Sequence, residues 1–168
     1  SGLWGYIIGD TVRFLSINPY RIVVTGRTKH FISAFGEHVI GEEVEEAIQE
    51  VAAEESIGII EFTVAPQVNP RAGEVPYHEW FVEFAEAPAD LKGFSKKVED
   101  IRCEKYIYYK DLIEGAMLQP LIIRSVPKDG FRNYMKSKGK LGGQNKMPRL
   151  ANDRTYANEL ISVLGLKV

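Results

Sequence analysis

Apolar residues recur along this chain with two different periods. Between Val44 and Ala52 they return every three or four positions, which is the spacing of one helix face, and the same spacing follows at Leu91–Ile101 and Ala157–Leu164. Shorter apolar runs, rich in Val, Ile, Phe and Tyr, predict strands. These strands are expected over residues 6–8 running on through 12–15, and over 21–25, 57–64, 77–84 and 121–126.

The order of these elements predicts an α+β fold, a mixed β-sheet covered by helices. The first two strands, joined by the turn-forming Ser16–Pro19, are expected to form a hairpin. The half-buried strands 57–64 and 77–84 are separated by a Pro- and Gly-rich loop and are expected to pair as neighbours. The stretch 106–115 fits either a helix or a strand.

The composition excludes several classes of protein but does not indicate a function. A chain of 168 residues is long enough for one good core, and a net charge of −2 gives no global field that would recruit nucleic acid or an anionic membrane. The single cysteine, Cys103, excludes an internal disulfide and any cysteine-based zinc site, and we expect a buried, inert thiol. With no apolar stretch that could span a bilayer and no signal-like segment, the sequence predicts a cytoplasmic protein.

A Gly-Asp pair follows the first strand-like run, in YIIGDTVRF. An ionised carboxylate only accepts hydrogen bonds, so Asp10 is suited to hold both hydroxyls of a ribose, although supporting the turn is the more ordinary role. If the strands pair as a hairpin, the guanidinium of Arg27 comes close to Asp10. The pair then becomes a candidate nucleotide contact.

The chain resembles one known family over nearly its whole length. The resemblance lies in YIIGD, then TGRTKHFISAFGEHV, the acidic GEEVEEAI and the later GGQNKMPRL. The chain is similar to the carboxyl-terminal part of the auxin-responsive Gretchen Hagen acyl-acid amido synthetases, which are adenylate-forming enzymes, in a version expected from bacteria. The resemblance implies the small mobile domain of a larger enzyme. It also implies ATP with Mg²⁺, a carboxylic acid substrate and an amino acid acceptor, although an acyl-CoA ligase of the phenylacetate type would share the same adenylation residues.

The resemblance also implies roles for four residues. Asp10 and Arg27 would bind the ribose, Lys29 would be the hinge between the domains, and Lys146 would swing in during adenylation. A lysine suits that last role because its compact ammonium stabilises charge that develops between a carboxylate and the α-phosphate.

The same resemblance divides the chain and implies a missing partner. Residues 1–28 would be a hairpin that carries the end of the large-domain nucleotide motif, and residues 29–168 the C-terminal α+β domain. The phosphate-cradling loop and the acyl pocket belong to the large domain in this family, so the chain is expected to be a fragment that folds alone and does not catalyse.

An alternative hypothesis, that the chain is not part of an enzyme, rests on the basic segment 128–149, which holds seven Lys or Arg and one acidic residue. Phe131 and Tyr134 would stack on bases while the cations follow phosphates, which would make the chain a non-catalytic nucleic-acid or protein-binding module. The eight glutamates between 37 and 55 predict a solvated helix face.

Three histidines and a tyrosine cluster have ordinary structural interpretations. The histidines at 30, 38 and 78 are too scattered for a metal site, and no metal ligands are predicted. The tyrosines at 106, 108 and 109 are expected to pack rather than to form a cofactor platform.

Overall fold

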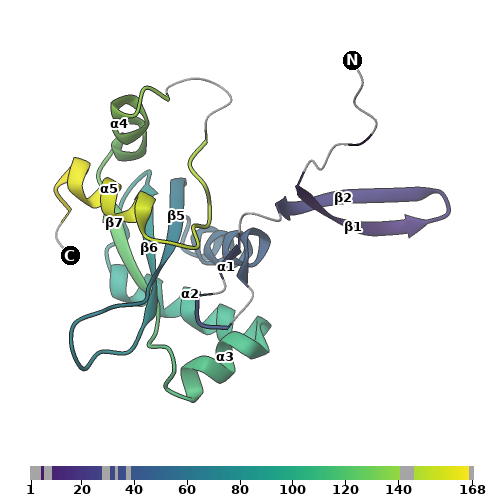
Figure 1. The fold of residues 1–168 in the computed structure, drawn as a ribbon, viewed down its shortest axis with the longest axis horizontal. Coiled ribbons are helices and arrows are strands. Elements are labelled where there is room, and N and C mark those ends of the chain that lie inside the picture. The colour runs from purple at the N-terminus through teal and green to yellow at the C-terminus, as the bar shows by residue number, and fades with distance from the viewer. Residues whose placement is uncertain are drawn as a thin grey trace.

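A computed structural model describes residues 5, 9–27, 31–32, 34–36, 39–140 and 146–166 (Figure 1). The strands are β1 (Asp10–Ile17), β2 (Tyr20–Arg27), β3 (Phe31–Ile32), β4 (Val39–Ile40), β5 (Ile59–Gln67), β6 (Tyr77–Phe84) and β7 (Ile122–Val126). The helices are α1 (Gly41–Glu54), α2 (Leu91–Lys105), α3 (Ile107–Glu114), α4 (Gly130–Ser137) and α5 (Thr155–Leu164).

The main sheet has three strands in the order β5-β6-β7. β5 and β6 are antiparallel, with Val64 opposite Trp80, whereas β6 and β7 are parallel, with Trp80 opposite Ile123. The expected pairing of the two central runs and the expected mixed sheet are therefore confirmed. β5 begins two residues later and ends three residues later than the sequence predicted, and it includes Pro66, which is tolerated because β5 is an edge strand of this sheet.

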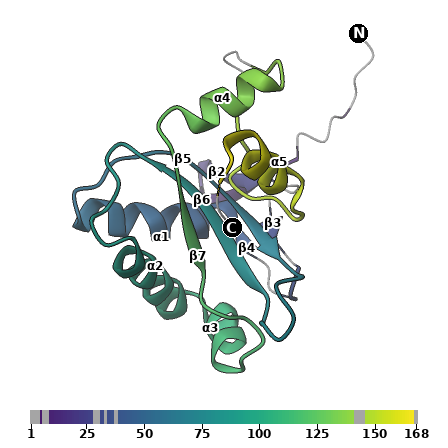
Figure 2. The ribbon, with the colours of Figure 1, turned by 90° about the vertical axis from the view of Figure 1, so that its left-hand side faces the viewer.

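Helices cover both faces of this sheet, as Figure 2 shows. On one face, Phe62, Trp80 and Val82 pack in a core with residues of α1 and α2. On the other face, Phe81 packs in a second core that includes Tyr134 of α4 and residues of α5. This α+β arrangement is the fold class that the sequence predicted.

β6 differs from its prediction as a half-buried strand, because all eight of its residues are buried. The middle strand of a sheet with helices on both faces has no solvent side, so its polar residues need partners within the protein. Glu79 receives hydrogen bonds from Arg124 and Arg154, and Glu83 accepts the backbone N–H groups of Asp129 and Phe131. Polar and apolar residues alternate along β6, but its polar residues also lie in the protein interior, where Glu79 and Glu83 have hydrogen-bond partners.

The predicted helices are confirmed, and two further segments, for which the sequence predicted no definite element, are helical. Every apolar position of the first helical stripe is buried in α1, and the ambiguous stretch after Tyr106 is the helix α3. The helix α4 lies within the basic segment, for which no element was predicted. No described helix is long and apolar enough to cross a membrane.

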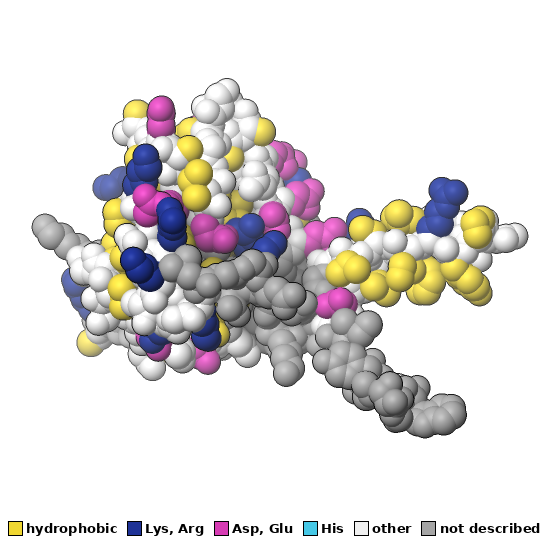
Figure 3. Space-filling model, turned by 90° about the horizontal axis from the view of Figure 1, so that it is seen from above, with side chains coloured by type: hydrophobic (Ala, Val, Ile, Leu, Met, Phe, Trp, Pro, Cys, Tyr) yellow, Lys and Arg dark blue, Asp and Glu magenta, His cyan; other side chains and the backbone are white. Residues whose placement is uncertain are grey.

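β1 and β2 form the predicted antiparallel hairpin, which projects away from the helices and the main sheet (Figure 1). Its turn is Asn18–Pro19, shorter than expected, and the run 6–8 lies outside the described residues. Large apolar side chains are exposed along the hairpin, and hydrophobic groups cover its visible face in Figure 3. They are Val12, Phe14, Leu15, Ile17, Tyr20, Ile22, Val23 and Val24.

Candidate functional site

A cleft of about 1080 Å³ separates the base of the hairpin from the body of the domain. Asp10, at the start of β1, and Lys146, in the segment before α5, both line it. The structure therefore brings together two of the four site residues named from the sequence, which stand far apart along the chain. The other lining residues are Arg13, Val24, Thr25, Gly41, Glu42, Glu45, Glu46, Gln49, Glu61, Met147, Pro148 and Arg149.

Lys146 reaches the cleft because the segment that follows it is fixed to the free edge of β5. The backbone N–H of Val64 donates to the carbonyl of Arg149 at 3.0 Å, and the N–H of Ala151 donates to the carbonyl of Val64 at 2.9 Å. Met147 is buried in the core against α4 and α5. The backbone that follows Lys146 is therefore held against β5. Lys146 itself is exposed, so its side chain is free to reach a ligand.

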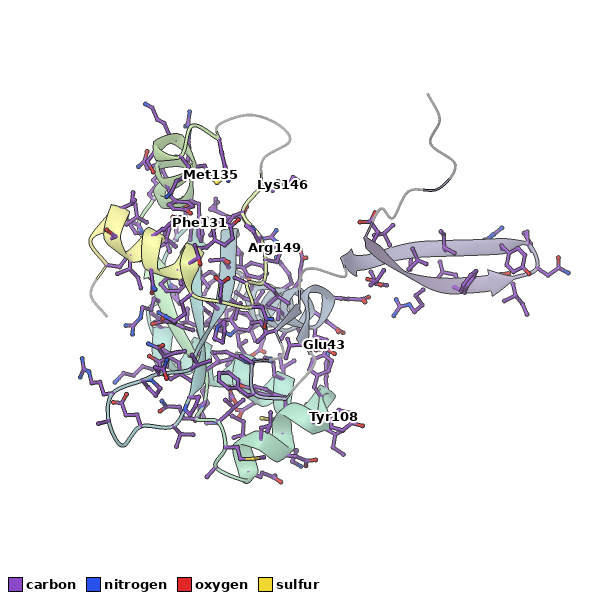
Figure 4. All side chains as sticks on the ribbon, in the orientation of Figure 1. Glu43, Tyr108, Phe131, Met135, Lys146 and Arg149 are labelled. Atoms are coloured by element: carbon purple, nitrogen blue, oxygen red, sulfur yellow. The ribbon has the colours of Figure 1, made fainter. Side chains whose placement is uncertain are left out.

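Arg149 joins this segment to both β5 and α1. Its Nη1 donates to Glu61, its Nη2 lies 3.9 Å from the Glu45 carboxylate, and its guanidinium stacks over the Phe62 ring at 4.3 Å from the centroid. Figure 4 shows Arg149 on the segment below Lys146. This arginine clamps the segment that carries the lysine.

Asp10 is presented by the open end of the hairpin. Gly9 has a φ of 79°, a backbone conformation that glycine adopts without strain, and it leads directly into β1. The backbone of Asp10 is paired with that of Arg27, as the sequence predicted, while the side chain of Arg27 and all of Lys29 lie outside the described residues. Asp10 therefore lines the cleft from the open end of the hairpin.

The acidic face of α1 is solvated, as the sequence predicted, since Glu45, Glu46 and Glu50 are exposed, and some of its glutamates also form ion pairs with neighbouring elements. Glu42 pairs with Arg13 of the hairpin at 3.4 Å, and Lys105 of α2 pairs with Glu46 at 2.9 Å and with Glu50 at 2.5 Å. The hydrogen bond from Lys105, followed by that from Tyr106, lowers the pKa of Glu46. These glutamates are used to hold neighbouring elements against α1.

The basic segment does not have the arrangement of a base-stacking surface. Phe131 and Tyr134 are both buried in the core beneath α4, so neither ring can stack on a nucleotide. Lys138 is paired with Glu159 at 2.7 Å, and Arg149 is paired with Glu61. The alternative of a nucleic-acid module loses the aromatic residues on which it rested.

His78 is buried in a structural cluster, as the sequence predicted, while the other two histidines lie outside the described residues. Its Nδ1 lies 3.1 Å from the Arg102 guanidinium, and its ring stacks on Tyr109. Tyr109 packs as expected, but Tyr108 is 79% exposed on α3, so the prediction that all three tyrosines pack is wrong (Figure 4). α3 turns only one side toward α2.

Cys103 is partly buried, and burial together with the nearby Glu99 raises the pKa of its thiol to about 11. The thiol is less buried than the sequence predicted, and its raised pKa lowers the fraction present as the reactive thiolate. Among the described residues, no group of three or more His, Cys, Asp or Glu is placed to hold a metal ion.

Glu45, Glu61 and Arg149 were missed as members of the site. Arg149 stood in the quoted Lys-Met-Pro-Arg motif, so its type and position were visible in the sequence. What could not be seen is that residues 148–151 would lie beside Thr63 and Val64, because an isolated parallel bridge between Val64 and Leu150 leaves no periodic signal.

Comparison with known proteins identifies a domain family. Residues 42–155 match the model described as "GH3 family C-terminal domain". No curated protein sequence matches this chain.

Among solved structures, the chain resembles a GH3.15 acyl acid amido synthetase with a TM-score of 0.74 and 16% identity, over 94% of this chain and 29% of the other. It also resembles AtGH3.15 acyl acid amido synthetase in complex with 2,4-DB, with a TM-score of 0.72 and 18% identity, over 98% of this chain and 31% of the other. The chain thus spans less than a third of the length of either solved relative.

Proposed function

Since this chain belongs to the GH3 family, as its C-terminal domain, we propose that it is the small domain of an ATP-dependent enzyme that activates a carboxylic acid as an acyl adenylate. The acyl group then passes to an amino acid to form an amide. The observation that carries this proposal is the shared cleft, which Asp10 of the hairpin and Lys146 both line.

In this proposal the two sides of the cleft bind different parts of ATP. Asp10, which accepts hydrogen bonds from both ribose hydroxyls, holds the nucleoside with the help of Arg27. Lys146 places its ammonium beside the α-phosphate, where negative charge develops as the carboxylate attacks. ATP supplies the phosphorus that is attacked and loses pyrophosphate.

The exposed apolar side chains of the hairpin support the proposal that a partner covers it. Eight large apolar side chains are exposed on β1 and β2, which is more than a projecting hairpin keeps in water without a binding surface. The chain spans about 30% of the solved relatives, so the remaining part of a longer parent is the partner that we propose. The N-terminal large domain would pack on the hairpin and supply the phosphate loop and the acyl pocket.

A hinge at Lys29 would let one cleft serve two reaction steps. The position lies between the hairpin, which carries Asp10, and the body, which carries Lys146. Rotation there would withdraw Lys146 after adenylation and open the adenylate to the acceptor. The division of the chain at residues 28 and 29 is part of the same proposal, as is a cytoplasmic location, where ATP and amino acids are available.

The test is ATP–pyrophosphate exchange by the full-length parent over a panel of carboxylic acids. We expect exchange by the parent, none by this chain alone, and about a hundredfold slower exchange by the Lys146→Ala parent, the effect of removing one charge-stabilising donor. The Lys92→Ala parent is the matched control, because Lys92 is an exposed lysine of α2 that does not line the cleft.

Two results would contradict the proposal. Exchange that survives Lys146→Ala unchanged would remove Lys146 from the site, and a parent that neither binds ATP nor exchanges with any acid would remove adenylation. Supplying amino acids or coenzyme A to an active parent separates the amide synthetase from the acyl-CoA ligase, because only the true acceptor releases the acyl group.

A further inference from the structure

An ion pair joins the hairpin to the body of the domain at the cleft. The Nη2 of Arg13, in β1, lies 3.4 Å from the Oε1 of Glu42, in the first turn of α1. Both residues line the same cleft as Asp10 and Lys146. The pair therefore connects the two parts of the chain between which the hinge is proposed.

The helix α1 also supports the other side of the cleft. Glu45, three residues after Glu42 on the same helix, lies 3.9 Å from the Nη2 of Arg149, which clamps the segment that carries Lys146. The ion pair thus fixes the hairpin, which carries Asp10, to the helix against which the lysine is positioned. The placement of the carboxylate relative to the lysine depends on this contact.

The two faces of the hairpin differ in character. Residues opposite each other on paired strands share a face, as do residues two apart on one strand. By the register of β1 and β2, six of the exposed apolar side chains lie on one face, and they are Val12, Phe14, Ile17, Tyr20, Ile22 and Val24. Arg13 belongs to the more polar face, together with Thr11, whose hydroxyl accepts a hydrogen bond of 3.1 Å from Thr25. The contact with α1 leaves the apolar face to the large domain proposed above.

The pair is suited to a contact that is made and broken in each catalytic cycle. The side chain of Arg13 is 63% exposed and that of Glu42 is 39% exposed. Water competes for both charges, so an exposed pair of this kind changes an equilibrium by no more than about fivefold. A large apolar contact at this place would instead hold the hairpin in one orientation and oppose rotation.

We propose that Arg13 and Glu42 are positioning residues for adenylation. Their ion pair holds the hairpin against α1 in the arrangement in which Asp10 and Lys146 line one cleft, and it breaks when the body rotates for the transfer of the acyl group. The reaction step to which the contact belongs rests on the proposed function, whereas the effect of the contact on the orientation of the hairpin does not.

The first experiment reverses each charge in the full-length parent and measures ATP–pyrophosphate exchange at saturating ATP. We expect Arg13→Glu and Glu42→Arg each to slow exchange by about fivefold, because each change places like charges opposite each other. The double variant, in which the two charges are exchanged, should restore the rate. Arg21→Glu is the matched control, because Arg21 is an exposed arginine of the hairpin that does not line the cleft, and exchange should be unaltered.

Transfer of the acyl group from a preformed adenylate to the acceptor should not be slowed in these variants, because the ion pair belongs to the first step. Opposite effects of the two single reversals on exchange would overturn the proposal, since they would show only an attraction of charge for ATP. Equal losses in both steps, unaltered exchange in both single variants, or a double variant as slow as the single ones would also overturn it.

A second measurement does not depend on activity. Spin labels at Ile17→Cys, near the tip of the hairpin, and at Lys92→Cys, on the exposed side of α2, report the distance between hairpin and body in the 168-residue chain with Cys103→Ser. We expect one narrow distance distribution, a broader one for either charge reversal, and a return to the narrow one in the double variant.

A distribution that neither reversal changes would overturn the proposal. A parent that shows no exchange, with an isolated chain that gives the expected distributions, would refute the proposed function and leave the orienting contact intact.

Discussion

The hydroxyl of Thr63, in β5, donates a hydrogen bond of 2.7 Å to the carbonyl oxygen of Pro148. Eighty-five positions separate the two residues, and Pro148 stands two residues after Lys146. Thr63 is buried, so its end of the bond is shielded from water. One threonine of the sheet thus helps to determine where the lysine of the cleft lies.

Thr63→Val removes the hydroxyl and keeps the shape of the side chain. We expect a loss of about 1 kcal/mol in the free energy of unfolding, because the Pro148 carbonyl loses its donor. Urea unfolding of the isolated chain measures this loss. Thr25→Val is the control, since Thr25 makes only an exposed hydrogen bond to Thr11 in the hairpin, and a loss equal to that of Thr63→Val would contradict the prediction.

Arg149 and Glu61 should be energetically coupled. The pair is partly exposed, and the arginine also stacks on Phe62, so a double-mutant cycle with Arg149→Gln and Glu61→Gln is expected to give a coupling of about 1 kcal/mol. In the full-length parent, Arg149→Gln should slow exchange by displacing Lys146, and Arg149→Lys should restore only part of the rate because it lacks the planar fork.

Lys97→Gln is the matched control for Arg149→Gln in the parent. Lys97 also binds two glutamates, Glu54 and Glu55 at the end of α1, and none of these three residues lines the cleft. Equal loss of exchange in both variants would mean that Arg149 acts only through the stability of α1.

Glu79 is the buried anion on which the middle strand depends. It has no exposed surface and receives hydrogen bonds from both Arg124 and Arg154. Glu79→Gln removes the negative charge that both guanidinium groups contact, and we expect a loss of about 3 kcal/mol on thermal or urea unfolding. Glu86→Gln, at an exposed position just after β6, should change stability by less than about 0.5 kcal/mol.

Cys103 should react slowly with iodoacetamide. Burial raises its thiol pKa from 9.0 to about 11, which leaves roughly a hundredfold less thiolate at pH 8 than in the unfolded chain. Because the folded pKa is the higher one, the protonated thiol favours the folded state below the unfolded pKa, and this contribution is lost as the pH rises toward 11. Alkylation rates from pH 7 to 10, with and without urea, measure the difference; equal rates would show that the thiol is accessible.

The sequence by itself determined the local elements of this protein. The helical spacing of Val44, Ala47 and Ile48 depends only on neighbours along the chain, and so does the hairpin that sets Asp10 opposite Arg27, so these features were predictable. The family motif also marked Lys146. Short-range pattern was enough wherever the partner of a residue lies within a few positions or across one tight turn.

Only the tertiary structure decided which distant groups meet. The burial of the whole of β6 follows from helices on both faces of the sheet, and the clamp of Arg149 on Glu61 follows from a segment docked on the edge of β5. The burial of Phe131 and Tyr134 in the second core likewise decided that the basic segment lacks a stacking surface. The energy gained by burying a side chain depends on residues far along the chain. The residue types within one segment do not specify which other segment it will pack against.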